Sequence, residues 1–521
     1  MGQSTRDANL SETHHTMHPF GLTTQRHRTN LSKASGQWGR HRLRVIPGTF
    51  IAILAVLTSG VRAQSFSIGV EFTAATLLDS GFTAADTMGS VGPDHIAVLI
   101  NGRFSVHDKT GTPLLGKSLD QFWTDAGISL VDSFSFDPRI LYDSDSQRWF
   151  ATSVDNHSSP NNILLAVSAS SDPTGTWTGF QIDSDSSDVY WADFPMMGIN
   201  GDVVAVSASM LPIICCGSRT NILVVPKDDL TAPAPTLANA TLVENATTAV
   251  VSHPAVDYDH RSLPLTMLSG THKILNGTIS RSNIIGSPTT PTIEYDFPAF
   301  TTLRNDPPRI DQPTAAANVH AGDTRFSSNP VLQDGSLWAV HSVDVHGLAA
   351  IEWYEIDAVT SDVLQSGVIS HPSLGFNFPS ISVNDDKDIV IGFSGGDPNT
   401  FMSAYAIVGS TTAGVTSFGP LTQLIAGAAP YERLDGSNRN RWGDYSATVL
   451  DPLNDQHFWT FQEYAIDTDQ WAIRVTQIIV PEPSSSILLI WLTLCLVSSQ
   501  RSMPGTKIDP GSKKRFPSNT L

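Results

Sequence analysis

The sequence predicts an all-β fold, a β-propeller of about seven blades of antiparallel strands, followed by one C-terminal apolar helix. No long stretch between Gln64 and Val480 keeps the apolar period of a helix. Val, Ile, Thr and aromatic residues instead alternate with turns rich in Asp, Asn, Gly and Pro, which is typical of many short strands. A unit also recurs along the chain, at spacings that suit blades with insertions in their loops.

This unit consists of Asp, Asn or His near a proline, an apolar strand, an Asp- or Asn-rich turn and a second apolar strand. It starts at residues 91, 137, 193, 253, 329, 377 and 443, at intervals of 46 to 76 residues. A proline that opens a strand is tolerated there, because the first residue need not donate to the ladder. We expect the strand near 65–72 to join 471–479 and complete one blade.

Residues 1–63 are expected to be a leader and signal peptide. Arg40, Arg42 and Arg44 precede the apolar run Phe50–Leu57, and Ala63 offers the small residue that signal peptidase needs at the cut. The apolar run is too short for a permanent membrane span. The sequence therefore predicts export, with the propeller domain occupying residues 64–479.

Residues 480–521 contain a second signal. Pro481, Glu482 and Pro483 precede an apolar run at 487–497, and Arg501 follows it. This order resembles the PEP-CTERM sorting signal. The resemblance implies a transmembrane helix with a basic tail, retention at the cell envelope, and the envelope sorting machinery as a partner. The tail after Arg501 is longer than is usual in that family.

The composition excludes some classes of partner. Residues 64–483 contain 18 Lys and Arg against 47 Asp and Glu. A body this acidic repels nucleic acid and anionic lipid, and it attracts divalent cations. The chain has three cysteines, two of them adjacent, so no disulfide framework is expected. Stability must then come from a large hydrophobic core.

The segment Ser170–Trp177 reads Ser-Ser-Asp-Pro-Thr-Gly-Thr-Trp. It resembles the Asp-box of sialidase-like propellers, with Gly175 one place late. In that family the box is a turn between outer strands of a blade, remote from catalysis. The resemblance therefore implies a fold, and the body looks like the secreted bacterial propellers of undefined function.

Two further motifs match catalytic patterns without their context. Residues 111–118 fit the phosphate-loop pattern, but Pro113 and two leucines occupy the loop, which favours a blade loop. Residues 392–396 fit the nucleophile-elbow pattern around Ser394, but a turn follows where a helix is needed. Neither motif indicates catalysis.

Two sets of residues are candidate binding groups. Residues that open the innermost strands should meet at the mouth of the central channel, together with nearby arginines, and could bind a glycan, a carboxylate or a metal. This predicted ligand site consists of Asp137, Arg139, Asp193, His253, Arg325, Asn329, Asn377, Arg441 and Asp444. The same residues could instead only cap turns. The acidic loop with Asp183, Asp185 and Asp188 is either a solvated loop or part of a calcium site.

The sequence thus favours a non-catalytic, surface-retained propeller that binds a glycan or protein at the envelope or in the extracellular matrix, with no certain cofactor beyond calcium as one option. A sialidase-type glycoside hydrolase is the alternative, although that class needs an arginine cluster and a nucleophile that are not recognisable. A calcium-stabilised structural exoprotein is a third interpretation.

Overall fold

The computed structural model describes residues 65–482, except 215–216, 248–250, 271–277, 302–303 and 315. The expected signal peptide with Ala63, and the sorting signal from Pro483 through Arg501 with its apolar helix, lie outside these residues. Pro481 and Glu482 are exposed and follow the last strand. In the part of the chain that the structure describes, no helix is long and apolar enough to cross a membrane.

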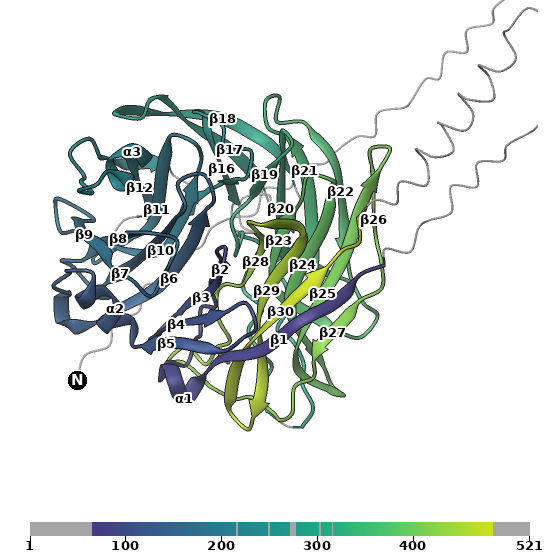
Figure 1. Cartoon of the computed structure of the whole chain (residues 1–521). Coiled ribbons are helices and arrows are strands. Elements are labelled where there is room, and N and C mark those ends of the chain that lie inside the picture. The colour runs from purple at the N-terminus through teal and green to yellow at the C-terminus, as the bar shows by residue number, and fades with distance from the viewer. Residues whose placement is uncertain are drawn as a thin grey trace, which may run out of the picture. The chain divides into compact units, whose positions relative to one another are not determined.

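The described chain is an all-β propeller, and five of its blades are separate antiparallel sheets (Figure 1). The first blade consists of β2 (Gly89–Val91), β3 (His95–Ile100), β4 (Arg103–Asp108) and β5 (Pro113–Lys117). The second consists of β6 (Ser135–Asp143), β7 (Arg148–Asp155), β8 (Asn162–Ser168) and β9 (Trp177–Asp183). The next is β14 (His253–Pro254), β16 (Leu265–Gly270), β17 (Thr278–Ser287) and β18 (Thr290–Thr301). The fourth separate blade consists of β23 (Gly375–Val383), β24 (Asp388–Asp397), β25 (Thr400–Thr412), β26 (Val415–Phe418) and β27 (Thr422–Ile425). The fifth consists of β28 (Ala447–Asp451), β29 (Asn454–Asp467), β30 (Gln470–Ile479) and β1 (Ser67–Thr76).

The remaining strands form one nine-stranded sheet. It contains β10 (Tyr190–Ile199), β11 (Val203–Pro212), β12 (Arg219–Pro226), β13 (Thr241–Thr247), β15 (Val256–Asp257), β19 (Val331–Gln333), β20 (Ser336–Val345), β21 (Leu348–Asp357) and β22 (Val363–Ile369). The two-residue strand β15 pairs in parallel with both β10 and β19. The expected count of about seven blades is therefore corrected: five blades are separate sheets, because β15 joins two further four-stranded groups by hydrogen bonds.

Among the described residues, four short helical segments connect strands: α1 (Leu77–Ser80), α2 (Leu119–Asp125), η1 (Val131–Ser133) and α3 (Lys227–Thr231). The ring closes through the expected pairing of the chain's two ends. β1 lies antiparallel to β30, with Ser67 opposite Ile479 and Thr76 opposite Ala472. The strand that begins the domain thus completes its last blade and covers an edge that would otherwise be free to pair.

The innermost strands β2, β6, β10, β14, β19, β23 and β28 meet in a closed circle, in which β15 bridges β10 and β19. In β6, β10 and β23 the repeated proline lies inside the strand. Pro138, Pro195 and Pro379 each occupy a β-bulge where the register with the next strand shifts. The expectation that proline opens these strands is corrected, because a bulge also tolerates a residue without an N–H donor.

The core lies between neighbouring blades. Trp149, Trp338, Trp459 and Trp471 are almost fully buried there. The indole N–H of Trp471 donates to the carbonyl of Thr83 at 2.9 Å, and that of Trp149 donates to the carbonyl of Ser171 at 2.9 Å. Large aromatic area combined with a satisfied N–H makes Trp149 and Trp471 effective links between strands and loops.

Candidate functional site

One cavity, of about 620 Å³, lies at the end of the ring where β6, β10 and β23 carry their bulges. Residues from the two long connections 304–330 and 426–446 complete its wall. We call it the axial cavity. Its lining includes three phenylalanines, three arginines, one histidine and five aspartates: Phe194, Phe326, Phe378, Arg325, Arg439, Arg441, His320, Asp137, Asp193, Asp306, Asp323 and Asp444. Its volume lies within the range of roughly 300–1,000 Å³ that is usual for ligand pockets.

The predicted ligand site is brought together only in part. Five of its residues line the axial cavity: Asp137, Asp193, Arg325, Arg441 and Asp444. Arg139 and Asn329 line a second cavity of about 210 Å³. This second cavity lies at the opposite end of the inner strands from the axial cavity. His253 and Asn377 are fully buried and line neither of the two.

The bulges explain which side chains reach the axial cavity. Asp137, Phe194 and Phe378 directly precede the three bulge prolines and have φ of 52°, 52° and 47°. Non-glycine residues adopt this left-handed region rarely, and such strain is concentrated at functional sites. Phe194 and Phe378 are therefore the structural equivalents of Asp137. Asp193 and Asn377 precede them by one residue.

Sequence reasoning identified Arg325, Arg441 and Asp444 in the two long connections, but it missed Asp306, His320, Asp323 and Arg439. The lengths of the repeat intervals could have indicated these residues. The longest intervals, 253–329 and 377–443, contain the two connections that wall the axial cavity. Insertions placed at one end of a propeller are a natural source of binding residues.

Three carboxyl groups, Asp86, Asp137 and Asp193, form a hydrogen-bonded chain, of which Asp137 and Asp193 line the axial cavity and Asp86 does not. Burial, together with neighbouring negative charge, raises the pKa of Asp137 to about 7 and that of Asp193 to about 6. The same causes hold the pKa of Asp86 well above its usual range. Carboxyl groups this close cannot all ionise, so the chain retains a proton at neutral pH.

Neighbouring groups fix this chain in place. The side chain of Asn101 donates to Asp86 at 2.5 Å, and its oxygen accepts the N–H of Asp137 at 2.8 Å. Asp137 Oδ2 accepts the N–H of Phe194 at 3.0 Å and the Tyr445 hydroxyl at 3.3 Å. Asp137 is therefore held by contacts from three separate segments of the chain.

The three arginines that line the cavity are each bound to an aspartate. The pairs are Arg325 with Asp323 at 2.6 Å, Arg441 with Asp444 at 2.7 Å and Arg439 with Asp435 at 2.7 Å. Arg325 makes a two-point contact, because its Nε also lies 2.9 Å from Asp323. Charge-assisted pairs of this kind already satisfy much of the guanidinium donor capacity.

Arg139 and His253 lie beneath the cavity. Arg139 is buried, donates from Nε to the carbonyl of Pro195 at 3.0 Å, and has its guanidinium 3.3 Å from the centroid of the Tyr445 ring. Burial and the charge of Arg139 lower the pKa of His253 to about 3, so its ring is neutral. Neither ring nitrogen of His253 has a hydrogen-bond partner within the described residues.

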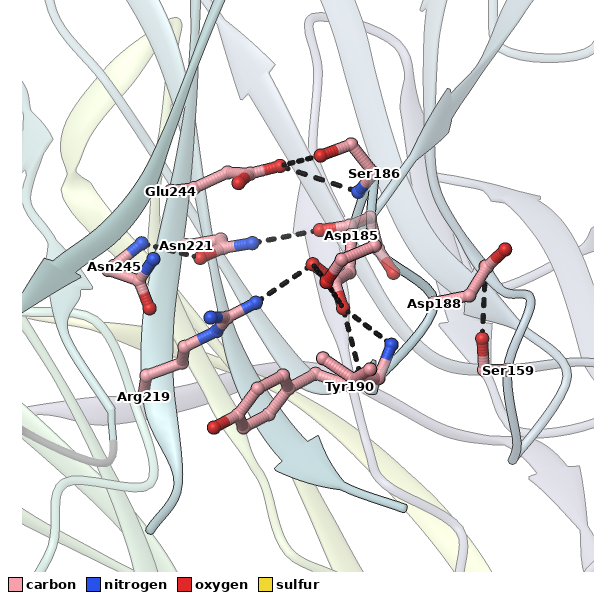
Figure 2. A network of polar contacts seen from close by, with 12 residues as sticks. Ser159, Asp185, Ser186, Asp188, Tyr190, Arg219, Asn221, Glu244 and Asn245 are labelled. Atoms are coloured by element: carbon pink, nitrogen blue, oxygen red, sulfur yellow. Dashed lines mark hydrogen bonds and ion pairs between the residues drawn. The ribbon is translucent and has the colours of Figure 1, made fainter. Parts of the chain in front are cut away.

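The acidic loop between β9 and β10 is held by internal contacts (Figure 2). Asp185 is bound to Arg219 at 2.8 Å and accepts two backbone N–H groups, while Asp188 accepts the hydroxyl of Ser159 at 3.0 Å. Asp183 accepts the N–H of Asp185 at 3.1 Å. Across the residues described, no three His, Cys, Asp or Glu side chains are grouped so as to hold a metal ion.

The Asp-box-like segment forms the predicted turn between the outer strands β8 and β9. Asp172 accepts the N–H of Thr174 at 2.9 Å, and the indole of Trp177 donates to the carbonyl of Pro173 at 2.9 Å. This turn lies outside the residues that line the axial cavity.

The other two motifs adopt structures unsuited to their patterns. Within 111–118, residues 113–117 form the extended outer strand β5, which corrects the expected blade loop. Ser394 is buried inside β24 and donates to the carbonyl of Glu463 at 2.7 Å. A phosphate loop and a nucleophile elbow both need a turn at these places.

The fold and the cavity define the class of protein as a β-propeller with a polar cavity at one end of its ring. No protein-family model and no curated protein matches the chain. Solved structures with partial similarity include a protein of unknown function from Dyadobacter fermentans, at 10% identity over 81% of this chain and 100% of that chain, with a TM-score of 0.40.

Two glycan-acting proteins are also partly similar. Trypanosoma rangeli sialidase in complex with sialic acid has 12% identity over 82% of this chain and 66% of that chain, with a TM-score of 0.35. An endo-arabinase from Bacteroides thetaiotaomicron has 15% identity over 55% of this chain and 96% of that chain, with a TM-score of 0.30. Similarity at this level carries no argument about what this chain does.

Proposed function

We propose that this protein binds a glycan in the axial cavity without transforming it. The observation that carries the proposal is the cavity itself, which places carboxylates, guanidinium groups and hydroxyls beside the rings of Phe194 and Phe378. Sugars present hydroxyl groups around their ring and an apolar ring face. A pocket that combines convergent polar groups with aromatic surface suits such a ligand.

The charge pattern argues against an acidic ligand. Arg325 and Arg441 each contact an aspartate, so a carboxylate on the ligand would have to compete with an existing ion pair. Asp137 and Asp193 would also repel it. This arrangement disfavours the sialidase-type alternative, which needs arginines free to hold the acid group of the sugar.

Glycan-array screening followed by calorimetry tests the proposal. For an uncharged glycan we expect Arg325→Gln to weaken binding by about tenfold or more, because a charged hydrogen-bond donor is lost. Arg304→Gln is a matched control, since Arg304 forms a comparable half-exposed ion pair with Glu352 and does not line the cavity. No binding to any glycan, or equal losses in the two variants, would contradict the proposal.

Glycoside hydrolysis is a second candidate, favoured by one observation. A carboxyl group with a pKa of about 7, at Asp137, beside the carboxyl group of Asp193 could protonate a leaving oxygen at neutral pH. Release of reducing ends from the glycan that binds, abolished in Asp137→Asn, would replace the non-catalytic proposal with this one. Unchanged glycan after prolonged incubation would exclude it.

We also propose that the chain is exported and retained at the envelope, on the sequence signals alone. Cleavage after Ala63 and retention through residues 484–499 are the expected behaviour. A chain truncated before Pro481 should be released into the medium. Recovery of the whole chain in the cytosol with Met1 intact would contradict this proposal.

A further inference from the structure

The lining of the axial cavity has an excess of negative charge. It contains five aspartates and three arginines. Two of these aspartates, Asp323 and Asp444, are bound to arginines, and Asp306 accepts the N–H and hydroxyl of Thr324. Asp137 and Asp193 remain, and within the described chain neither forms an ion pair with lysine, arginine or histidine.

These two carboxyl groups are placed where a ligand could reach them. Both line the cavity, and Asp137 is only 8% exposed, so its interaction with a ligand charge would be weakly screened. The cavity volume of about 620 Å³ suits an organic molecule rather than a bare ion.

From this geometry we infer that the glycan bound by the axial cavity carries a primary ammonium group, which sits on Asp137 and Asp193. The inference rests on the proposed function and adds the chemical class of the ligand. An ammonium donates three hydrogen bonds and replaces the proton that the carboxyl groups otherwise share.

Other charged groups modulate this contact from every side. Asp86, Asp444 and Glu463 supply further carboxyl groups, and Arg139, Arg325 and Arg441 oppose a cation. Tyr445, His253 and His320 complete the surroundings, and burial lowers the pKa of both histidines. Raised carboxyl pKa values mean that Asp137 and Asp193 are protonated in acid and ionised above about pH 7. Affinity for the ammonium should therefore increase from pH 5 to pH 7, and it should fall again where the amine itself loses its proton.

The test compares two probes on the full chain: a β-1,4-linked oligomer of 6-amino-6-deoxyglucose, whose amine stays protonated at pH 7, and its fully N-acetylated counterpart, whose nitrogen cannot be charged. At pH 7 we expect the amine oligomer to bind about tenfold tighter or more, as expected for a close charge pair. At pH 5 we expect the preference to shrink. Calorimetry at pH 6 in buffers of different ionisation enthalpy should show net release of protons on binding the amine oligomer.

The variant Asp137→Asn plus Asp193→Asn should lose the preference and still bind the acetylated oligomer. Asp188→Asn is a matched control, because Asp188 has a similar positive φ of 55° and lies outside the cavity lining. The probe comparison on the unchanged protein needs no variant to fold. Equal binding of both oligomers at pH 7 would overturn this inference and leave glycan binding intact, whereas binding of neither would overturn both.

Discussion

Replacing Asp137 by Asn should raise the free energy of unfolding above that of the parent, and this gain should be larger at neutral pH than in acid. The pKa of the Asp137 carboxyl rises from an ordinary 3.8 to about 7 in the fold, chiefly because the group is buried. A tenfold change in a proton equilibrium corresponds to about 1.4 kcal/mol, so keeping this proton costs the folded state up to about 4 kcal/mol. Asn removes that cost, and it tolerates the φ of 52° at this position.

The sign follows from a folded-state pKa that lies above the unfolded one. Below about pH 4 the group is protonated in both states, and its contribution to stability is fully present. Between pH 4 and pH 7 the unfolded chain releases the proton while the folded chain keeps it, so the parent loses stability. The variant has no such group, and the difference in unfolding free energy should grow over this window in favour of Asn.

Urea unfolding at pH 4.5, 6 and 8, followed by the fluorescence of the 11 tryptophans, measures this difference. Asp188→Asn, at an exposed turn with a φ of 55°, serves as the control and should parallel the parent. A free-energy difference between Asp137→Asn and the parent that stays constant from pH 4.5 to 8 would refute the reasoning.

Three further predictions concern stability. Deleting residues 65–76 removes β1 and bares the edge of β30, so we expect a lower melting temperature and aggregation on size-exclusion chromatography; an unaltered monomer would contradict the role of the closure. Lys227→Met should cost about 3 kcal/mol in urea unfolding, because the buried Lys227 contacts Asp143 at 3.1 Å and its loss removes the lysine charge beside that buried carboxylate; a loss near zero would argue against it. Asp172→Ala should cost about 1 kcal/mol without changing glycan binding, and a binding defect would show that this turn reaches the site.

The sequence supports the class of fold well, because alternating apolar residues and the repeated unit are local features. It does not reveal the nine-stranded sheet, since β15 is two residues long and pairs through contacts distant in sequence. It also misplaces the repeated prolines. A residue such as Pro195 is compatible with a strand start or with a bulge, and only the pairing with β11 distinguishes them.

The candidate site was predicted in part for a similar reason. Asp137 and Asp193 were identified from their places in the repeat, and both line the axial cavity. Phe194 was not, because the bulge turns the residue before the proline toward the cavity and makes it the equivalent of Asp137. Asp323 forms an ion pair with Arg325. It lies in a long connection that contains no repeat, so the sequence does not reveal this ion pair.

The closure of the ring also sets an orientation. Ile479 lies opposite both Ser67 and His457, at the end of the last blade where the turn from Asp451 to Asp455 lines the second cavity. Asp444 lines the axial cavity at the other end of β28, which runs from Ala447 to Asp451. Both ends of the folded domain thus leave from the side away from the axial cavity. A support coupled to either end of the folded domain would therefore leave the axial cavity on the opposite side, open to a ligand in solution.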